Sequence, residues 1–451
     1  MLPSSHLARK LRITHYFTLG WGTMVGVGWL VVMDDWLSRG GPLGAILGFA
    51  IGGALLFPIG YVYGQLVMAM PDASGEIAYT AKVFPERVSF ATGWMMVLAY
   101  LIVCPWEAVA VGRIAGYIFP ALNSGQLYTV GGKPVYVPHL ILGLGLTALI
   151  TILNYRGIRL SAGFQNWTTF GTLALFAVFV GFGTAHGSVT HFPPLFAGSG
   201  VFVSILLVMQ IVPYFMTGFE SVGKAAEEAN PEFRSSNFLK AIMMAIAVGI
   251  AFYTIVIAAV AYAAPWKSLL NRPFMTAVAF ERAVGSRWIV NIILAAALLS
   301  LLKVFNGNFV AASRLLFALG RRGLVDCRFA AVHPRNYTPH VAVIWIGIIT
   351  AACMFLGQAL LVPISEVGSV ASATGWTAAC CAYYLMEPSV RKRFVAALGA
   401  LIGLMMIVMK VVPLVPGHFS GYEWLALLVW IGLGAALRAR EKLLAEGKAA
   451  N

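Results

Sequence analysis

Two ionisable residues, Glu107 and Lys303, stand inside long apolar stretches of the sequence. An unpaired charge at the centre of a bilayer costs at least about 2.5–3.5 kcal/mol, so such residues usually face a protein interior and serve function. Either side chain could load and release a proton. Lys303 could instead be paired structurally or reach into a water-filled vestibule. Glu107 could instead pair with Lys303, contact a substrate ammonium group or make a structural hydrogen bond.

A glycine-rich motif predicts a break in the first apolar segment. Residues 20–28 (GWGTMVGVG) contain four glycines, and each costs roughly 1 kcal/mol inside a helix. Non-helical backbone at membrane depth is tolerated only where it is buried in protein or lines a cavity. Its free N–H groups attract a carboxylate, and its free carbonyl groups attract a cation. Close helix packing through the glycines is the alternative explanation.

A second break is predicted within residues 213–220 (PYFMTGFE). Pro213 removes one backbone donor and Gly218 weakens the next helical turn. The two broken segments are the first members of two halves and run in opposite directions, as an inverted repeat requires. Interrupted segments at corresponding positions of two halves indicate the binding site of a transporter.

The composition predicts the elements that must position these residues. The chain is 60% hydrophobic and 11% charged, with a mean hydropathy of +0.83, whereas soluble domains carry about 25% charged residues. A soluble enzyme, a disordered chain and a nucleic-acid-binding domain are therefore excluded. Twelve apolar segments are long enough to span a bilayer. They are 13–37, 42–69, 86–119, 138–154, 161–184, 200–222, 238–263, 287–319, 340–360, 363–387, 394–414 and 420–437.

The distribution of positive charge sets the expected orientation. Most of the 31 Lys and Arg residues, Lys224 among them, fall in the connections on the side that holds both termini. The positive-inside rule therefore places both termini in the cytoplasm. The net charge of +14 then reflects cationic loops rather than nucleic-acid binding. The five cysteines lack metal-ligand spacing, so we expect neither a disulfide framework nor a metal site.

Other polar and small residues have simpler expected roles. Arg113 and Lys410 are expected to snorkel toward a membrane surface. Asp34 and Asp35 are expected to cap a helix or line the outer vestibule, with attraction of cationic substrates as an alternative. A stripe of small residues predicts close helix packing inside the chain or a dimer face, and hence a monomer or a homodimer. Its members are Gly40, Gly44, Gly48 and Gly52.

Five passages together resemble the amino acid–polyamine–organocation (APC) superfamily, the amino acid permeases with the LeuT-like fold. They occur in the family's order across most of the chain. They are residues 22–28 (GTMVGVG), 70–79 (MPDASGEIAY), 154–161 (NYRGIRLS), 218–220 with 226–231 (GFE, AEEANP) and 311–314 with 318–323 (AASR, ALGRRG).

The resemblance implies an all-α integral membrane fold in one transport domain over residues 1–451. Spans 1–5 (13–184) and spans 6–10 (200–387) would form two inverted repeats, with spans 11 and 12 (394–437) peripheral. The first break would hold a substrate carboxylate and the second its ammonium group. The implied binding residues are Thr23, Met24, Val25, Gly26, Val27, Gly28, Tyr214, Phe215, Met216, Thr217 and Gly218, with Phe305 lining the pocket. Tyr214 would be an aromatic gate and Glu220 a gate on the cytoplasmic side. Apart from the resemblance, we expect Trp106 to contact the substrate, because it lies near the predicted cavity.

The sequence departs from the family pattern at the coupling position. Many relatives have a lysine in span 5 that substitutes for a sodium ion, and Thr172 stands there instead. We expect Lys303 to replace that lysine from across the cavity between spans 1, 5 and 8. Thr172 with a hydroxyl from span 8 could instead build a sodium site. Glu76 stands where a second glycine is usual. Together, these departures leave the coupling ion and the side-chain specificity open.

These observations predict secondary transport of an amino acid across the cell's inner (plasma) membrane by alternating access. Proton coupling is favoured over sodium coupling or exchange, and no cofactor is expected. A polyamine or cationic amino acid carrier is the alternative within transport, and a channel or a membrane amino acid sensor is the alternative in another class. The chain lacks HExxH, GxSxG and paired intramembrane aspartates, so no enzyme is predicted.

Overall fold

Long apolar helices make up most of the computed structural model, which describes residues 9–270, 272, 274–357 and 361–449. In lipid, a helix satisfies its own backbone hydrogen bonds, so an apolar chain of this length folds into a helical bundle. Within the described residues, eight helical stretches are long and apolar enough to cross a membrane, and His340–Met354 is a shorter apolar helix. The predicted helical membrane class is confirmed. Residues 358–360 of the predicted segment 340–360 lie outside the described residues.

The first half of the chain contains nine α-helices, counted over the described residues. They are α1 (Ile13–Met24), α2 (Gly28–Val31), α3 (Met33–Ala54), α4 (Leu56–Ala69), α5 (Glu76–Ala81), α6 (Glu86–Leu101), α7 (Val103–Ile118), α8 (Val137–Arg156) and α9 (Ile158–His186). An antiparallel hairpin of β1 (Gln126–Val130) and β2 (Lys133–Tyr136) connects α7 to α8. The hairpin is a small departure from the all-α prediction.

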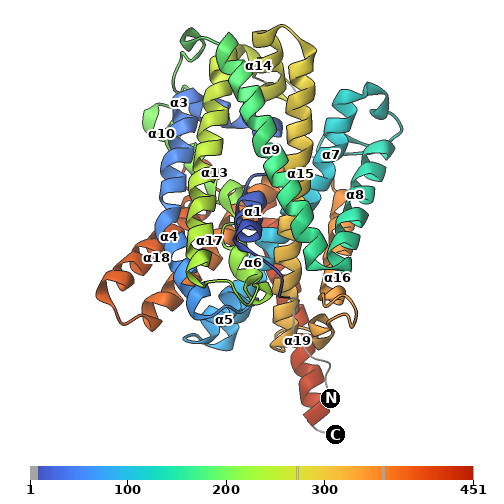
Figure 1. The fold of residues 1–451 in the computed structure, drawn as a ribbon, viewed down its shortest axis with the longest axis vertical. Helices are drawn as coiled ribbons and strands as arrows, with labels where there is room; N and C mark the ends of the chain where they lie inside the picture. Colours follow the sequence, from blue (N-terminus) through green and yellow to red (C-terminus); the bar gives the residue numbers. More distant parts are fainter. Residues whose placement is uncertain (1–8, 271, 273, 358–360, 450–451) are drawn as a thin grey trace.

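The second half continues with ten α-helices in the described part of the chain. They are α10 (Val201–Met209), α11 (Val212–Met216), α12 (Ser221–Lys224), α13 (Ser236–Ala263), α14 (Met275–Val284), α15 (Arg287–Arg321), α16 (His340–Met354), α17 (Leu361–Met386), α18 (Val390–Val411) and α19 (Gly421–Ala449). The helices α5 and α14 lie at opposite ends of the bundle (Figure 1).

Both segments in which a break is predicted are interrupted in the structure. The helix α1 ends at Met24, Val25 is extended, and α2 starts at Gly28. In the second segment, Thr217 is extended and Gly218 has φ +136°, a value that favours glycine. The helix α1 lies in the middle of the bundle and packs against α9, α13 and α15 (Figure 1). The first break is therefore surrounded by protein rather than lipid.

The stripe of small residues on α3 packs inside the chain, against α10 and α11. A Cβ on Gly48 would lie 2.6 Å from Cβ of Val208, and a Cβ on Gly52 would lie 2.9 Å from Cγ2 of Val212. The missing side chains therefore let α3 approach α10 and α11 closely.

We predict that Gly48→Ala destabilises the fold by about 1–3 kcal/mol, because the added methyl group overpacks the α3–α10 contact. Gly145→Ala on α8 is the matched control, since a Cβ there meets nothing within 4 Å and alanine favours a helix. Thermal unfolding of both variants in detergent measures the effect. Equal melting temperatures would contradict the role assigned to this contact.

Candidate functional site

The two breaks lie against each other at the centre of the bundle. A Cβ on Gly218 would stand 2.7 Å from the backbone nitrogen of Met24. The hydroxyl of Tyr253 on α13 lies 3.1 Å from the carbonyl oxygens of both Met24 and Phe215. Tyr253 is fully buried, and the sequence analysis did not predict a role for it. The available signal was a tyrosine inside an apolar segment, because a buried hydroxyl usually needs a partner.

The carbonyl end of the first break is bound by α15. The ammonium group of Lys303 donates a hydrogen bond to the carbonyl oxygen of Val25. The hydroxyl of Ser300 lies 3.1 Å from the same oxygen and 2.7 Å from that of Gly26. Lys303 is fully buried, and its Nζ lies 4.5 Å from the ring centroid of Trp21. A basic side chain and a hydroxyl group therefore bind carbonyl groups at the end of α1 that have no helical partners.

The amide end of the same break is bound by α7. The carboxylate of Glu107 accepts a hydrogen bond from the backbone of Val27, and its Oε1 lies 2.5 Å from the place of a Cβ on Gly26. Oε2 of Glu107 is buried and has no hydrogen-bond partner in the described residues. The first break thus carries a basic side chain at its carbonyl end and an acidic side chain at its amide end.

The second break is held by α17 and by its own side chains. The hydroxyl of Thr217 lies 2.6 Å from the carbonyl oxygen of Pro213 and 2.5 Å from Oγ of Ser372 on α17. The backbone N–H of Gly218 donates to Oε2 of Glu220 at 3.0 Å. The predicted gate residue Glu220 therefore belongs to the break itself.

Aromatic rings pack around the two breaks where they approach Trp36. A Cβ on Gly28 would lie 2.5 Å from the ring of Phe215, and that ring lies 4.9 Å from the ring of Trp36. Tyr214 packs against Gly368 of α17, where a Cβ would lie 2.9 Å from the tyrosine ring. Glycines on two different helices thus make room for the two aromatic rings of α11.

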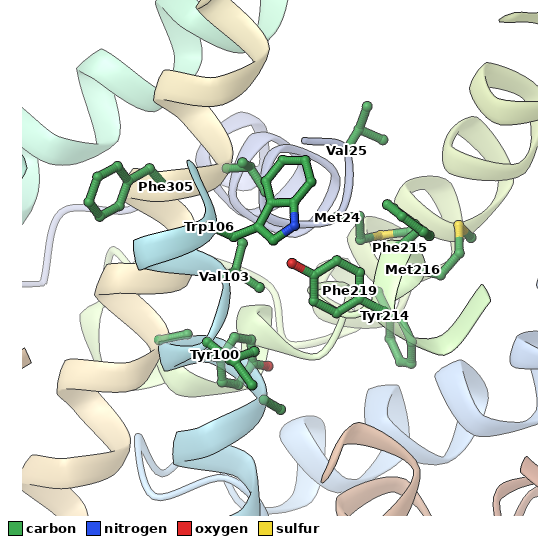
Figure 2. Packing of buried hydrophobic residues seen from close by; sticks show 14 of the residues in the cluster. Met24, Val25, Tyr100, Val103, Trp106, Tyr214, Phe215, Met216, Phe219 and Phe305 are labelled. Atoms are coloured by element: carbon green, nitrogen blue, oxygen red, sulfur yellow. The ribbon is translucent and has the colours of Figure 1, made fainter. Parts of the chain in front are cut away.

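Several of the predicted binding residues lie near one another, whereas Phe305 points in another direction. Trp106, Tyr214 and Met24 gather beside the first break, whereas Phe305 points away from that group (Figure 2). Phe305 instead has its ring 6.4 Å from that of Phe309. The hydroxyl of Thr172 donates to the carbonyl of Thr168 within α9 at 2.8 Å.

A buried ion pair lies next to the second break, toward the α5 end. Lys224 pairs with Glu76, and both side chains are at most 1% exposed. The hydroxyl of Tyr63 donates to Oε1 of Glu76 at 2.7 Å, and Nζ of Lys224 lies 3.3 Å from the carbonyl oxygen of Glu220. The prediction that Lys224 is a loop cation is wrong, because α12 turns it inward. The unusual residue Glu76 supplies its partner.

Further ion pairs tie the α5 end together. Arg314 pairs with Glu228 at 3.1 Å in a buried contact, and Arg321 bridges Asp72 at 3.0 Å and Glu227 at 2.7 Å. Burial raises the pKa of Asp72, but hydrogen bonds to Ser74 and the nearby Arg321 and Arg322 charges outweigh it and hold that pKa below its ordinary value. These contacts join the loop before α5, the segment after α12 and the end of α15.

A second group of charges lies beyond the second break, away from α5. Lys410 pairs with Glu366 and is 1% exposed, and Arg39 contacts the same carboxylate at 3.4 Å and Asp35 at 2.8 Å. The prediction that Lys410 snorkels is wrong, because α17 offers it a carboxylate inside the protein. Asp35, expected to cap a helix or line a vestibule, forms an ion pair.

Comparisons with known proteins agree with this architecture. A family model described as "Amino acid permease" matches residues 15–435. The methylthioribose transporter of Bacillus subtilis (strain 168) is 25% identical, over 96% of this chain and 93% of its own length. The amino-acid permease RocE of the same strain is 23% identical, over 82% of this chain and 79% of its own. The aromatic amino acid transport protein AroP of Escherichia coli (strain K12) is 25% identical, over 80% and 77%.

We predict that Lys224→Met destabilises the protein by about 3–5 kcal/mol, because it leaves the Glu76 carboxylate buried without a cation. The double variant Glu76→Gln with Lys224→Met should recover most of that loss. Arg287→Met is the control, because its ion pair with Glu281 is exposed and worth about 0–1 kcal/mol. Thermal unfolding in detergent compares the variants, and a double variant no more stable than Lys224→Met would refute the coupling.

Proposed function

From the premise that this chain belongs to the amino acid permease family, we propose that it is a secondary active transporter of an amino acid that works by alternating access. The family is one of permeases rather than enzymes, and the chain is a multi-pass membrane protein. We further propose twelve spans, with residues 13–184 and 200–387 as inverted repeats and 394–437 as peripheral helices. The protein then resides in the plasma membrane with both termini in the cytoplasm.

The observation that carries the proposal is the contact between the two breaks. Unwound backbone at the middle of a bundle offers free N–H and carbonyl groups to a zwitterion. The carboxylate of the amino acid binds the motif from Thr23 to Gly28, and its ammonium group binds residues 214–218. Trp106 and Tyr214 contact its side chain.

Lys303 is the proposed site of proton coupling. Its ammonium group lies on the Val25 carbonyl, between α1 and α15, where a coupling cation would otherwise be attracted. Loss of its proton weakens one of the contacts that hold α15 to the first break, the others being those of Ser300, so protonation changes the strength of this junction. Proton coupling is favoured over sodium coupling for this reason.

Two gates are proposed around the site. Tyr214 and Phe215 separate the substrate from the side of Trp36. Glu220, with the buried pair of Glu76 and Lys224, closes the side toward α5. Alternating access then requires the two groups to open in turn.

A second candidate function is transport of an uncharged sugar thioether. The similarity to the methylthioribose transporter favours this candidate, because the match covers 96% of this chain. Such a substrate would not need the charged groups of the first break.

Uptake into proteoliposomes tests the proposal. A mixture of labelled amino acids and labelled methylthioribose is offered with and without an acid-outside pH gradient. Gradient-stimulated uptake of an amino acid is the expected result. Uptake of methylthioribose alone would establish the second candidate, and amino acid uptake that ignores the gradient would reject proton coupling.

We predict that Lys303→Met reduces the pH-gradient dependence of uptake, because the variant cannot load a proton next to Val25. Lys240→Met is the control, since Lys240 is exposed at the start of α13. Initial uptake rates are measured at several external pH values. A Lys303→Met variant with the full pH dependence of the wild type would show that the coupling proton binds elsewhere.

A further inference from the structure

The first break already holds an acidic and a basic side chain, the two kinds of group that an amino acid carries on its α-carbon. The Glu107 carboxylate accepts the backbone hydrogen bond of Val27, and the Lys303 ammonium group donates to the carbonyl of Val25. A zwitterionic substrate brings a carboxylate and an ammonium group of its own. Since the amide of Val27 belongs to the motif proposed to bind the substrate carboxylate, Glu107 and the substrate compete for one donor.

We propose that Glu107 occupies the substrate's carboxylate position when the site is empty, and that the substrate carboxylate displaces it. This inference rests on the proposed function, because it requires a substrate with a carboxylate. Glu107 is then a specificity residue, since only a ligand carboxylate can replace the hydrogen bond that the side chain gives up.

Packing around Gly26 requires displacement rather than sharing. The place of a Cβ on Gly26 lies 2.5 Å from Oε1 of Glu107 and 3.1 Å from Cγ1 of Val304. The space beside the amide is thus filled by one carboxylate and one branched side chain. A second carboxylate enters only if Glu107 rotates away from Val27.

Displacement links substrate binding to proton binding. A displaced Glu107 lies in a buried site beside another carboxylate, and two like charges there favour protonation of one of them. Several groups face Glu107, namely Lys303 from α15, Tyr214 from α11, Tyr253 from α13 and Cys104 on its own helix. Of these, only Lys303 is basic, and it already donates to Val25. The occupied site therefore binds more protons than the empty one, so affinity rises as the pH falls.

The binding experiment compares the wild type with Glu107→Gln and Glu107→Asp. Each of the twenty common amino acids is titrated against purified protein at pH 5.5 and pH 8.0, with thermal stabilisation as the readout. The decarboxylated amines of leucine, phenylalanine and lysine (isoamylamine, 2-phenylethylamine and cadaverine) are titrated in parallel. Glu86→Gln is the control, because Glu86 is exposed at the start of α6.

In Glu107→Gln, we expect amino acids to bind about tenfold tighter or more at pH 8.0, because no charged competitor holds the Val27 amide. Binding by this variant should be nearly independent of pH, and affinity for the amines should not increase. Glu107→Asp, whose shorter side chain withdraws from Val27, should also bind more tightly but keep the pH dependence. This second variant gives a result even if Glu107→Gln does not fold.

Two results would overturn the inference while leaving the proposed function intact. Equal amino acid affinities in the wild type and both variants would show that Glu107 does not compete. Loss of both amino acid and amine binding in Glu107→Gln would show that the carboxylate holds the ligand's ammonium group. In contrast, if no amino acid stabilises the folded wild type or any variant, the proposed function itself fails.

Discussion

Backbone polar groups at membrane depth must find partners inside the protein, and the architecture follows from this requirement at two breaks. Lys303 and Ser300 bind the carbonyl groups that α1 leaves free, and Glu107 binds the first amide beyond them. Tyr253 reaches both breaks at once. The helices α7, α13 and α15 must therefore converge on α1, and the remaining helices enclose this group.

Ionic contacts are concentrated on the two sides of the breaks. Toward α5, Lys224 with Glu76 and Arg314 with Glu228 are buried pairs, and the other side holds Lys410 with Glu366. Desolvation offsets much of the attraction in such pairs, so they contribute more to geometry than to net stability. On both sides of the breaks, charged side chains are therefore buried against one another.

The elements were predictable from the sequence, but their side-chain partners were not. Apolar runs gave the helices, and the glycines of residues 20–28 and Pro213 with Gly218 gave the breaks, because these signals are local. Lys303 was recognised from its place in an apolar run, yet its partner Val25 is 278 residues away. Glu76 and Lys224 are 148 positions apart, and Lys410 on α18 pairs with Glu366 on α17. Such pairings depend on helix register and rotation, which periodicity alone does not fix.

The hydroxyl of Tyr253 carries a single hydrogen, although two carbonyl oxygens lie 3.1 Å away. It can donate fully to Met24 or to Phe215, but not to both. If one break swings away, the tyrosine keeps a bond to the other, and no buried hydroxyl is stranded by the movement. A small rotation about one carbon–oxygen bond thus lets the two backbone segments separate while the tyrosine hydroxyl keeps one hydrogen bond throughout.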